Sequence, residues 1–203
     1  MGGKLVVKLL MENWRKYLLL ENLQNTTKLA IFDFDETIAF SDTITNVIDK
    51  VTGKTFQVTT QEELDKLRGD SDRYEFDFSP LDIVTNAVEN PFVTNILREK
   101  IADPMTNVMV LTARRDAVED DIHRVLDSFK INTKEVYIVG LEGANKGEFV
   151  LEQIIQKYPN IKEVEFYDDS LNNITAMKIT KNIADLEKFD IYYVEHGKPK
   201  LVK

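Results

Sequence analysis

The hydrophobic pattern from residue 28 onward alternates short apolar runs with segments of helical periodicity. The short runs are rich in valine and isoleucine, which is typical of strands that are buried on both faces of a parallel sheet. We expect such strands over 28–34, 108–111, 135–139, 163–167 and 191–194, with helices near 114–129, 147–157 and 170–179 between the later ones. The pattern therefore predicts an α/β fold with a doubly wound parallel sheet, whose ligands bind beyond the carboxyl ends of the strands.

Residues 38–107 break this alternation, because they form a connection far too long for a simple crossover. Helical patterns near 43–51, near 61–68 and after Pro91 predict a small, mainly helical insertion, or cap, directly after the first strand. Within it, aromatic and acidic residues alternate over 74–78. The rings can stack on a base, but the intervening acids would repel a polynucleotide, so a half-buried strand is the favoured interpretation.

Residues 1–27 form a segment of their own, ahead of a main domain over 28–203. Apolar residues recur at helical spacing over 5–23, which predicts an amphipathic helix followed by a linker. We expect the helix to pack on the domain's own core, and the alternative is a docking helix for a partner or for self-association. Because Lys8 interrupts the first apolar run and no stretch is long enough to span a membrane, we expect a cytoplasmic protein without membrane contact.

The net charge of −9 and the absence of cysteine narrow the possible functions. A chain this acidic is a poor match for extended nucleic acid or an anionic membrane, although a local pocket can still hold one phosphate or one strand end. Without cysteine there is no disulfide, thiolate zinc site or cysteine nucleophile. The two histidines, His123 and His196, are too few for a multi-histidine metal site, and we expect both on the surface.

Polar residues follow several of the expected strands. They are Asp33, Asp35 and Thr37 after the first strand, Thr112 after the second, and Asp168 and Asp169 after the fourth. Thr112, Ser170 and the second acidic pair can be explained as helix caps. Asp33 and Asp35 cannot be explained as easily, because the residues after them do not read as a helix start. Paired acids at the end of a buried strand indicate a metal, a phosphate or both, since like charges held close need compensation.

These residue types have complementary chemistry. Several carboxylates can hold Mg²⁺, which prefers hard oxygen ligands. A hydroxyl and a turn of backbone amides can bind phosphate oxygens, and a lysine can offset the negative charge of a nucleophile and a phosphate. The combination suits phosphoryl transfer to a carboxylate.

The order and spacing of these residues resemble the haloacid dehalogenase (HAD) superfamily of phosphohydrolases, over roughly 28–194. Its first motif, Asp-x-Asp-x-Thr after an apolar strand, is matched at 33–37. Its second motif, an apolar strand that ends in serine or threonine, is matched at Thr112, and its fourth, an acidic pair after a strand, at 168–169. The resemblance implies a Rossmann-like core with a cap inserted after the first strand.

The third motif of the family is a lysine, and its best match is Lys146, with Lys134 and Lys157 as alternatives. Lys146 opens a predicted helix at the expected strand-end face, whereas Lys157 ends one. Glu36 stands where many members of the family carry glycine. Several phosphatase branches of the family carry glutamate there, so the departure does not put activity in doubt.

The resemblance also implies roles. Asp33 would be the nucleophile that forms an aspartyl-phosphate, and Asp35 would be the general acid and then the general base. Mg²⁺ would be held by the Asp33 carboxylate, the Asp35 backbone carbonyl and Asp168. Asp169 would act through water or orient Lys146.

For the substrate, two local features are similar to the 3′-phosphatase domain of bacteriophage polynucleotide kinase. A lysine stands just before an acidic amphipathic helix, and an arginine stands two residues after the hydroxyl of the second motif. The residues that this places at the substrate are Thr112, which would donate to the phosphate, Ala113, Arg114 and, as a weaker match, Arg73. Arg114 either binds a phosphate or lies in solvent at the start of a helix. We expect a phosphorylated small molecule, a nucleotide or a 3′-phosphorylated nucleic-acid end as substrate.

The leading interpretation is therefore a Mg²⁺-dependent phosphomonoesterase. A dehalogenase is a different chemical branch, and the acidic pair at 168–169 argues against it because that chemistry needs no metal site. The non-enzymatic alternative is a binding protein that keeps the fold and uses residues 5–23 as its interaction element.

Overall fold

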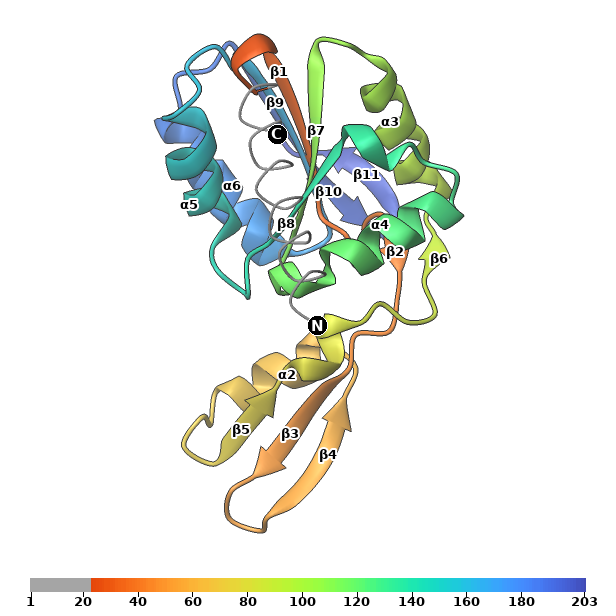
Figure 1. The fold of residues 1–203 in the computed structure, drawn as a ribbon. Helices are drawn as coiled ribbons and strands as arrows, with labels where there is room; N and C mark the ends of the chain where they lie inside the picture. Colours follow the sequence, from red (N-terminus) through yellow and green to blue (C-terminus); the bar gives the residue numbers. More distant parts are fainter. Residues whose placement is uncertain (1–22) are drawn as a thin grey trace, which may run out of the picture.

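A six-stranded sheet forms the centre of the protein in the computed structural model, which describes residues 23–203 (Figure 1). The order of the strands is β11-β10-β9-β1-β7-β8, and neighbours are parallel except for β11, which is antiparallel to β10. The strands are β1 (Lys28–Phe32), β7 (Thr106–Thr112), β8 (Val136–Gly140), β9 (Glu163–Asp168), β10 (Lys188–Glu195) and β11 (Lys198–Leu201). All five strands expected from the apolar runs are confirmed, and the protein is a mixed α/β structure with a largely parallel central sheet.

Helices cover both faces of this sheet (Figure 1). Along β1, Ala30 and Phe32 belong to one hydrophobic cluster, while Leu29 and Ile31 belong to the other. The first cluster includes residues of the helices α3 (Pro91–Ala102) and α4 (Glu119–Ser128). The second includes residues of the π-helical stretch η4 (Val150–Ile155), which continues α5 (Lys146–Phe149), and of α6 (Leu171–Ile183). Burial on both faces explains why the strands read as continuous apolar runs.

The antiparallel edge strand β11 was not expected from the sequence. It joins β10 through a two-residue turn at His196 and Gly197, whose φ angles of 51° and 76° are both positive. This combination is the turn geometry that suits a tight hairpin, and glycine adopts it without strain.

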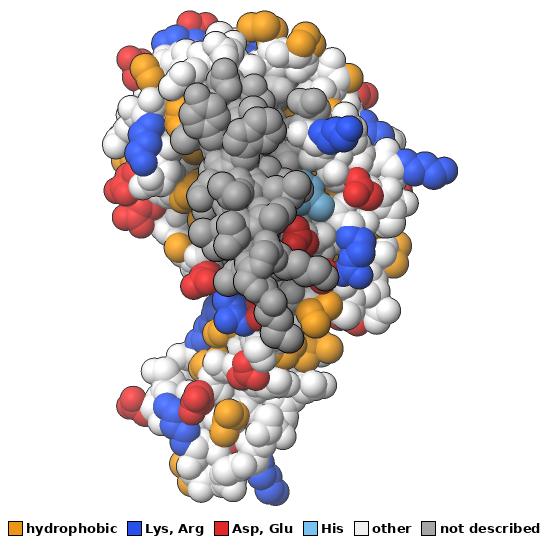
Figure 2. Space-filling model, viewed as in Figure 1, with side chains coloured by type: hydrophobic (Ala, Val, Ile, Leu, Met, Phe, Trp, Pro, Cys, Tyr) orange, Lys and Arg blue, Asp and Glu red, His pale blue; other side chains and the backbone are white. Residues whose placement is uncertain are grey.

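The insertion after β1 leaves the core through a short ribbon and then forms a module of its own. The ribbon pairs β2 (Ala39–Phe40) with β6 (Val88–Glu89). The module contains the sheet β4-β3-β5, the helix α2 (Gln61–Arg68) and the short helix η1 (Ser79–Asp82). Its strands are β3 (Thr45–Asp49), β4 (Lys54–Val58) and β5 (Tyr74–Asp77). Figure 2 shows the module as a lobe that projects from the core.

The expectation of a mainly helical insertion was wrong for 43–51, where the structure has β3. The residues Thr43, Ile44, Thr45, Val47 and Ile48 are β-branched, and the buried positions of β3 recur with the period of two that a half-buried strand requires. The expected helices over 61–68 and after Pro91 are confirmed. The alternating segment over 74–78 contains β5, and its three aromatic rings pack half-buried against the module's own small core, as the strand interpretation expects.

The predicted amphipathic helix over 5–23, with both of its proposed roles, lies outside the described residues apart from its last position. Leu23 is fully buried in the cluster beneath α6 and η4. Within residues 23–203, no helix has both the length and the apolar character needed to cross a membrane.

Candidate active site

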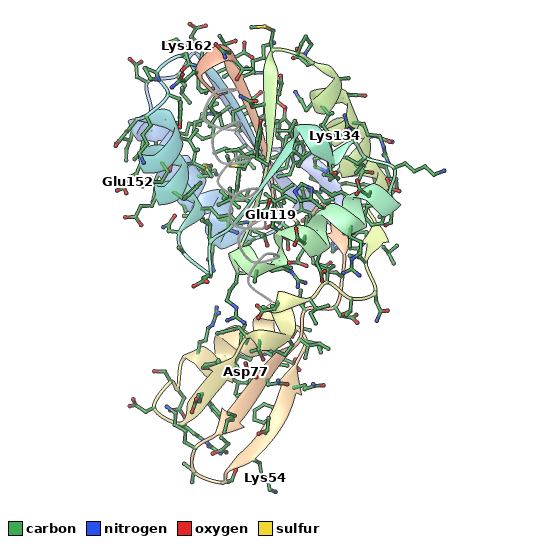
Figure 3. The ribbon with its side chains drawn as sticks, in the orientation of Figure 1. Lys54, Asp77, Glu119, Lys134, Glu152 and Lys162 are labelled. Atoms are coloured by element: carbon green, nitrogen blue, oxygen red, sulfur yellow. The ribbon has the colours of Figure 1, made fainter. Side chains whose placement is uncertain are left out.

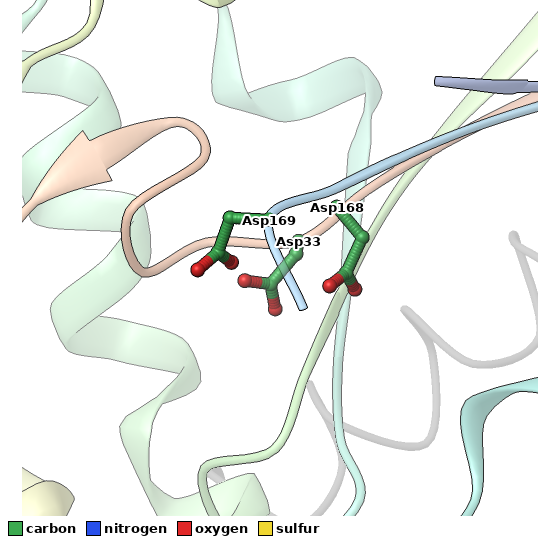
Figure 4. A group of neighbouring side chains, drawn as sticks. All are labelled: Asp33, Asp168 and Asp169. Atoms are coloured by element: carbon green, nitrogen blue, oxygen red, sulfur yellow. The ribbon is translucent and has the colours of Figure 1, made fainter. Parts of the chain in front are cut away.

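Three carboxylates meet where β1 and β9 end, and Figure 4 shows them gathered together. Asp33 follows β1, and its backbone amide donates to the carbonyl oxygen of Tyr167, one residue before Asp168 at the end of β9. Oxygen atoms of Asp33, Asp168 and Asp169 all lie within 4.8 Å of one another. Among the described residues, this is the group of acids and histidines that is close enough to share a metal ion. The predicted convergence of the first and fourth strand ends is therefore observed.

The carboxylates of the cluster repel one another, and a cation would reduce this repulsion. Asp168 is fully buried and Asp33 is 7% exposed. Burial is the largest cause that raises the pKa of Asp33 well above its ordinary value; Lys146 opposes the rise, whereas the neighbouring acids add to it. Burial and the Asp168 carboxylate likewise raise the pKa of Asp169 to about 7. Both shifts express the cost of holding negative charges together away from water.

Lys146 is the cation that the structure places in this cluster. Its Nζ donates a hydrogen bond of 2.7 Å to Asp168 Oδ2 and another to Asp33 Oδ1. Burial alone would lower the pKa of Lys146, but the carboxylates of Asp168 and Asp33 outweigh it and raise that pKa above its ordinary value. The ammonium group is therefore charged at any physiological pH.

The structure places one of the three candidate lysines, Lys146, at the acidic cluster. Lys146 is at the start of α5, and Asn145 caps this end because its side-chain oxygen accepts a hydrogen bond from the amide of Glu148. Lys134 and Lys157 are both exposed, the first in a short helical turn before β8 and the second bonded to Gln153. Only Lys146, of these three, contacts the acidic cluster.

Asn173 supports the cluster and was missed in the sequence analysis. Its side-chain amide donates to both carboxylate oxygens of Asp168, at 3.1 and 3.0 Å, from the first turn of α6. The Ser170 amide also donates to Asp168, at 2.8 Å, and the Ser170 side chain makes no capping bond. Thr37 donates to Asp169 Oδ1 at 3.4 Å, which links the loop after β1 to the acidic pair. Asp168 is thus held in one orientation by neighbours that leave Asp169 more open.

Thr112 ends β7, beside β1 in the sheet, and is almost fully buried. Its hydroxyl oxygen accepts a hydrogen bond of 3.2 Å from the amide of Arg114, so the hydroxyl hydrogen is available to another acceptor. Ala113 follows in an exposed turn, and its carbonyl accepts from the amide of Gly143. Thr112 and Ala113 therefore present a hydroxyl and a turn of backbone at the same edge of the sheet as Asp33.

Asp35 lies outside the three-acid group and pairs with Arg114 instead. The Arg114 guanidinium donates two hydrogen bonds of 2.8 Å, one to each oxygen of the Asp35 carboxylate. Arg114 is 2% exposed, so the interpretation that places it in solvent is wrong. The structure also gives it internal partners rather than an open position toward a substrate. The expected metal contact of Asp35 concerns its backbone carbonyl and stays a prediction.

Arg73 is the one predicted site residue that the structure places elsewhere. It donates to Asp49 Oδ2 at 2.8 Å, and its guanidinium lies over the Tyr74 ring. In the module sheet, Asp49 of β3 lies opposite Lys54 of β4. Lys54, labelled in Figure 3, marks the end of this sheet that is remote from the core. Arg73 therefore stabilises the module and does not join the other candidates.

Glu36 adopts a left-handed backbone conformation, with φ of 56°. This conformation is costly for a residue with a β-carbon and explains why glycine would be suited to this position. Burial and then Asp35 raise the pKa of its carboxyl, and Glu36 in turn contributes to the raised pKa of Asp169. Glu36 thus adds a fourth negative group beside the cluster.

The arrangement combines three clustered acids, one buried lysine and one hydroxyl at the carboxyl edge of a parallel sheet. If the three acids are ionised, they and Lys146 leave two negative charges uncompensated, which a divalent cation would neutralise. The cluster can therefore hold a metal ion. No protein-family model matches the chain, and no curated protein matches its sequence.

Proposed function

We propose that the protein is a Mg²⁺-dependent phosphomonoester hydrolase of the HAD type. The observation that carries the proposal is the contact of Lys146 Nζ with both Asp33 and Asp168, in a cluster whose third acid is Asp169. A lysine bridged between a candidate nucleophile and a candidate metal ligand suits phosphoryl transfer to a carboxylate, because it can offset the negative charge of the nucleophile and the phosphate. A protein that only binds has no evident need for this costly burial of charge.

The donor set suits Mg²⁺, because it consists of hard carboxylate oxygens and contains no sulfur or imidazole. Asp33 and Asp168 would hold the ion together with the Asp35 carbonyl, and Asp169 would act through water. When bound, the ion would neutralise phosphate charge and help to orient the phosphoryl group. The raised pKa values of Asp33 and Asp169 support the fit, since both express a repulsion that a cation would remove.

In the proposed reaction, an Asp33 carboxylate oxygen attacks phosphorus and the bond from phosphorus to the leaving oxygen breaks. Asp35 donates a proton to that oxygen, so an alcohol leaves. A water molecule then attacks the phosphorus of the aspartyl-phosphate while Asp35 takes its proton. This step releases inorganic phosphate and restores the Asp33 carboxylate. Lys146 and the Thr112 hydroxyl stabilise the negative charge of the phosphoryl oxygens.

The substrate class is a phosphorylated small molecule, a nucleotide or a 3′-phosphorylated nucleic-acid end. Support for a nucleic-acid end comes from the sequence resemblance, in which Arg114 was the main substrate cation. Because Arg114 pairs internally with Asp35, that support is weakened and a small phosphomonoester is favoured.

The test is hydrolysis of 4-nitrophenyl phosphate with Mg²⁺ and with a chelator. We expect turnover only with the metal, and loss of turnover in Asp33→Asn. The matched control is Asp72→Asn, which changes an exposed acid of the module. Unchanged turnover in Asp33→Asn would contradict the nucleophile assignment, and a protein that binds Mg²⁺ but hydrolyses no phosphomonoester would favour a binding role.

A further inference from the structure

Arg114 joins three parts of the protein that are separate in the sequence. One is the Asp35 carboxylate at the site, and the other two are the segments that connect the module to the core. We call residues 41–44 the first connector and residues 81–87, which begin in the last turn of η1, the second connector. The guanidinium is buried where these segments meet, and all five of its N–H groups have partners within reach.

The contacts with the second connector are made by one terminal nitrogen. Arg114 Nη1 donates to the carbonyl oxygens of Leu81 and Ile83, at 2.8 and 3.1 Å. Backbone carbonyls cannot rotate away independently of the chain, so these bonds report the position of the connector itself. The same connector is fixed to the core by the Val84 amide, which donates to Asp121 Oδ2 at 3.1 Å.

The contacts with the first connector are made by the other terminal nitrogen. Arg114 Nη2 reaches Ser41 Oγ at 3.3 Å and the Asp42 carbonyl at 3.4 Å, in addition to its bond with Asp35. Ser41 Oγ itself donates to Asp35 Oδ1. The first connector therefore reaches the Asp35 carboxylate directly and through Arg114.

The two connectors are also bonded to each other, so they attach the module as a joined pair. The Asp42 amide donates to the Thr85 carbonyl at 3.1 Å, and Asn86 donates to Asp42 Oδ2 at 2.6 Å. A shift of the module must move both connectors. The guanidinium is planar and its donors have fixed directions. Arg114 therefore cannot stay bonded to both displaced connectors and also keep its two hydrogen bonds to Asp35.

We propose that Arg114 is a positioning residue that couples the placement of the module to the orientation of the Asp35 carboxylate. With the module seated as in this structure, Arg114 and Ser41 hold Asp35 in one orientation, and its side chain is 19% exposed. With the module displaced, Asp35 loses Ser41 and Arg114 loses its partners in the connectors, so the Asp35 carboxylate is held less firmly. The inference rests on the proposed function, because it assigns the consequence to proton transfer by Asp35.

The test compares Arg114→Lys with a matched control, Arg115→Lys. Arg115 stands in the same turn, but its guanidinium bonds to Asp82 in the second connector and not to Asp35. We expect Arg114→Lys to lower kcat by at least about tenfold with little change in KM, since acid–base catalysis is typically worth more than this. The loss of kcat/KM, which reports the step that expels the leaving group, should be larger for an alkyl phosphate than for 4-nitrophenyl phosphate, whose leaving group needs no proton. Arg115→Lys should leave the ratio of kcat/KM for the two substrates unchanged.

Two results would overturn the assignment. A raised KM with unchanged kcat would mean that Arg114 binds the substrate phosphate. An equal loss of kcat/KM for both leaving groups would mean that Arg114 does not act on proton transfer to the leaving group. A double-mutant cycle with Asp35→Ala gives a further check. If Arg114 acts through Asp35, adding Arg114→Lys to Asp35→Ala should lower kcat no further.

Hydrogen exchange in the folded protein tests the coupling without any activity. Arg114→Lys should speed amide exchange in both 34–42 and 79–87, whereas Arg115→Lys should do so only in 79–87. Unchanged exchange over 34–42 in Arg114→Lys would overturn the coupling even in an active enzyme. If the wild type hydrolyses no phosphomonoester, the proposed function fails while this readout still decides the coupling. Should Arg114→Lys not fold, Ser41→Ala removes the direct link to Asp35 and should give the same pattern at smaller amplitude.

Discussion

Replacing Asp169 by asparagine should stabilise the metal-free protein at alkaline pH. An amide has nearly the shape of a carboxyl group and can keep the contact with Thr37, but it never becomes negative. Asp169 holds its proton up to a pH of about 7 in the folded state, compared with an ordinary pKa of 3.8. The variant therefore removes a charge that the folded protein tolerates poorly.

Because the pKa of Asp169 is raised in the folded state, its contribution to the free energy of unfolding falls as pH rises. The folded state binds the Asp169 proton more tightly than the unfolded state, so wild-type stability is fully present below pH 4 and is lost as pH rises through about 7. The difference between 3.8 and about 7 is about three pKa units, and each corresponds to 1.36 kcal/mol, which sets an upper limit of ~4 kcal/mol. Solvent access to Asp169 makes the expected loss smaller than this limit.

The assay is urea unfolding of wild type and variant in a chelator, at pH 4.5 and pH 8. We expect Asp169→Asn to be more stable than wild type at pH 8, by ~1–3 kcal/mol, and by less than ~1 kcal/mol at pH 4.5. Adding Mg²⁺ at pH 8 should stabilise the wild type more than the variant, because the ion compensates the charge that the variant lacks. A variant that is less stable than wild type at pH 8, or a difference independent of pH, would refute the electrostatic account of the cluster.

Lys146→Met should abolish turnover and destabilise the metal-free protein by ~3–5 kcal/mol at pH 8, because it leaves two buried carboxylates without a cation. The control is Lys157→Met, which changes an exposed lysine. Equal losses of stability for the two variants in urea unfolding would contradict the role assigned to Lys146. Gly147→Ala should cost ~1–3 kcal/mol, because a β-carbon there would lie 2.7 Å from the Ala176 carbonyl oxygen of α6. Gly69→Ala, where the nearest atom is 3.4 Å away, should be almost neutral, and similar values for the two would show that α5 and α6 do not pack this closely. Glu36→Gly should raise the free energy of unfolding by ~1 kcal/mol, because glycine adopts the left-handed conformation at less cost and the variant removes a negative charge. A loss of stability in thermal unfolding would show that Glu36 makes a compensating contact.

The sequence predicted the central sheet because its strands are buried on both faces, so apolar runs such as 108–111 stand out from their surroundings. It also predicted the meeting of Asp33, Asp168 and Lys146, since carboxyl ends of parallel strands share one edge. The error at 43–51 arose because a strand exposed on one face contains polar residues, and its period of two was mistaken for a helical one.

The pairing of Asp35 with Arg114 could not be predicted, because the two residues are 79 positions apart and their contact depends on how the module attaches. Asn173 was missed for a similar reason. It reaches Asp168 only because α6 begins directly after β9, and a single amide on a helix gives no signal in the sequence.

The central claim is that Asp33 carries the phosphoryl group, and trapping that intermediate tests it most directly. The protein is mixed with 4-nitrophenyl phosphate and Mg²⁺, quenched rapidly in acid, digested and measured by mass spectrometry. The account predicts one added phosphoryl group on the peptide that contains Asp33, and none in Asp33→Asn. Steady turnover without this adduct, together with an equally active Asp33→Asn, would contradict it.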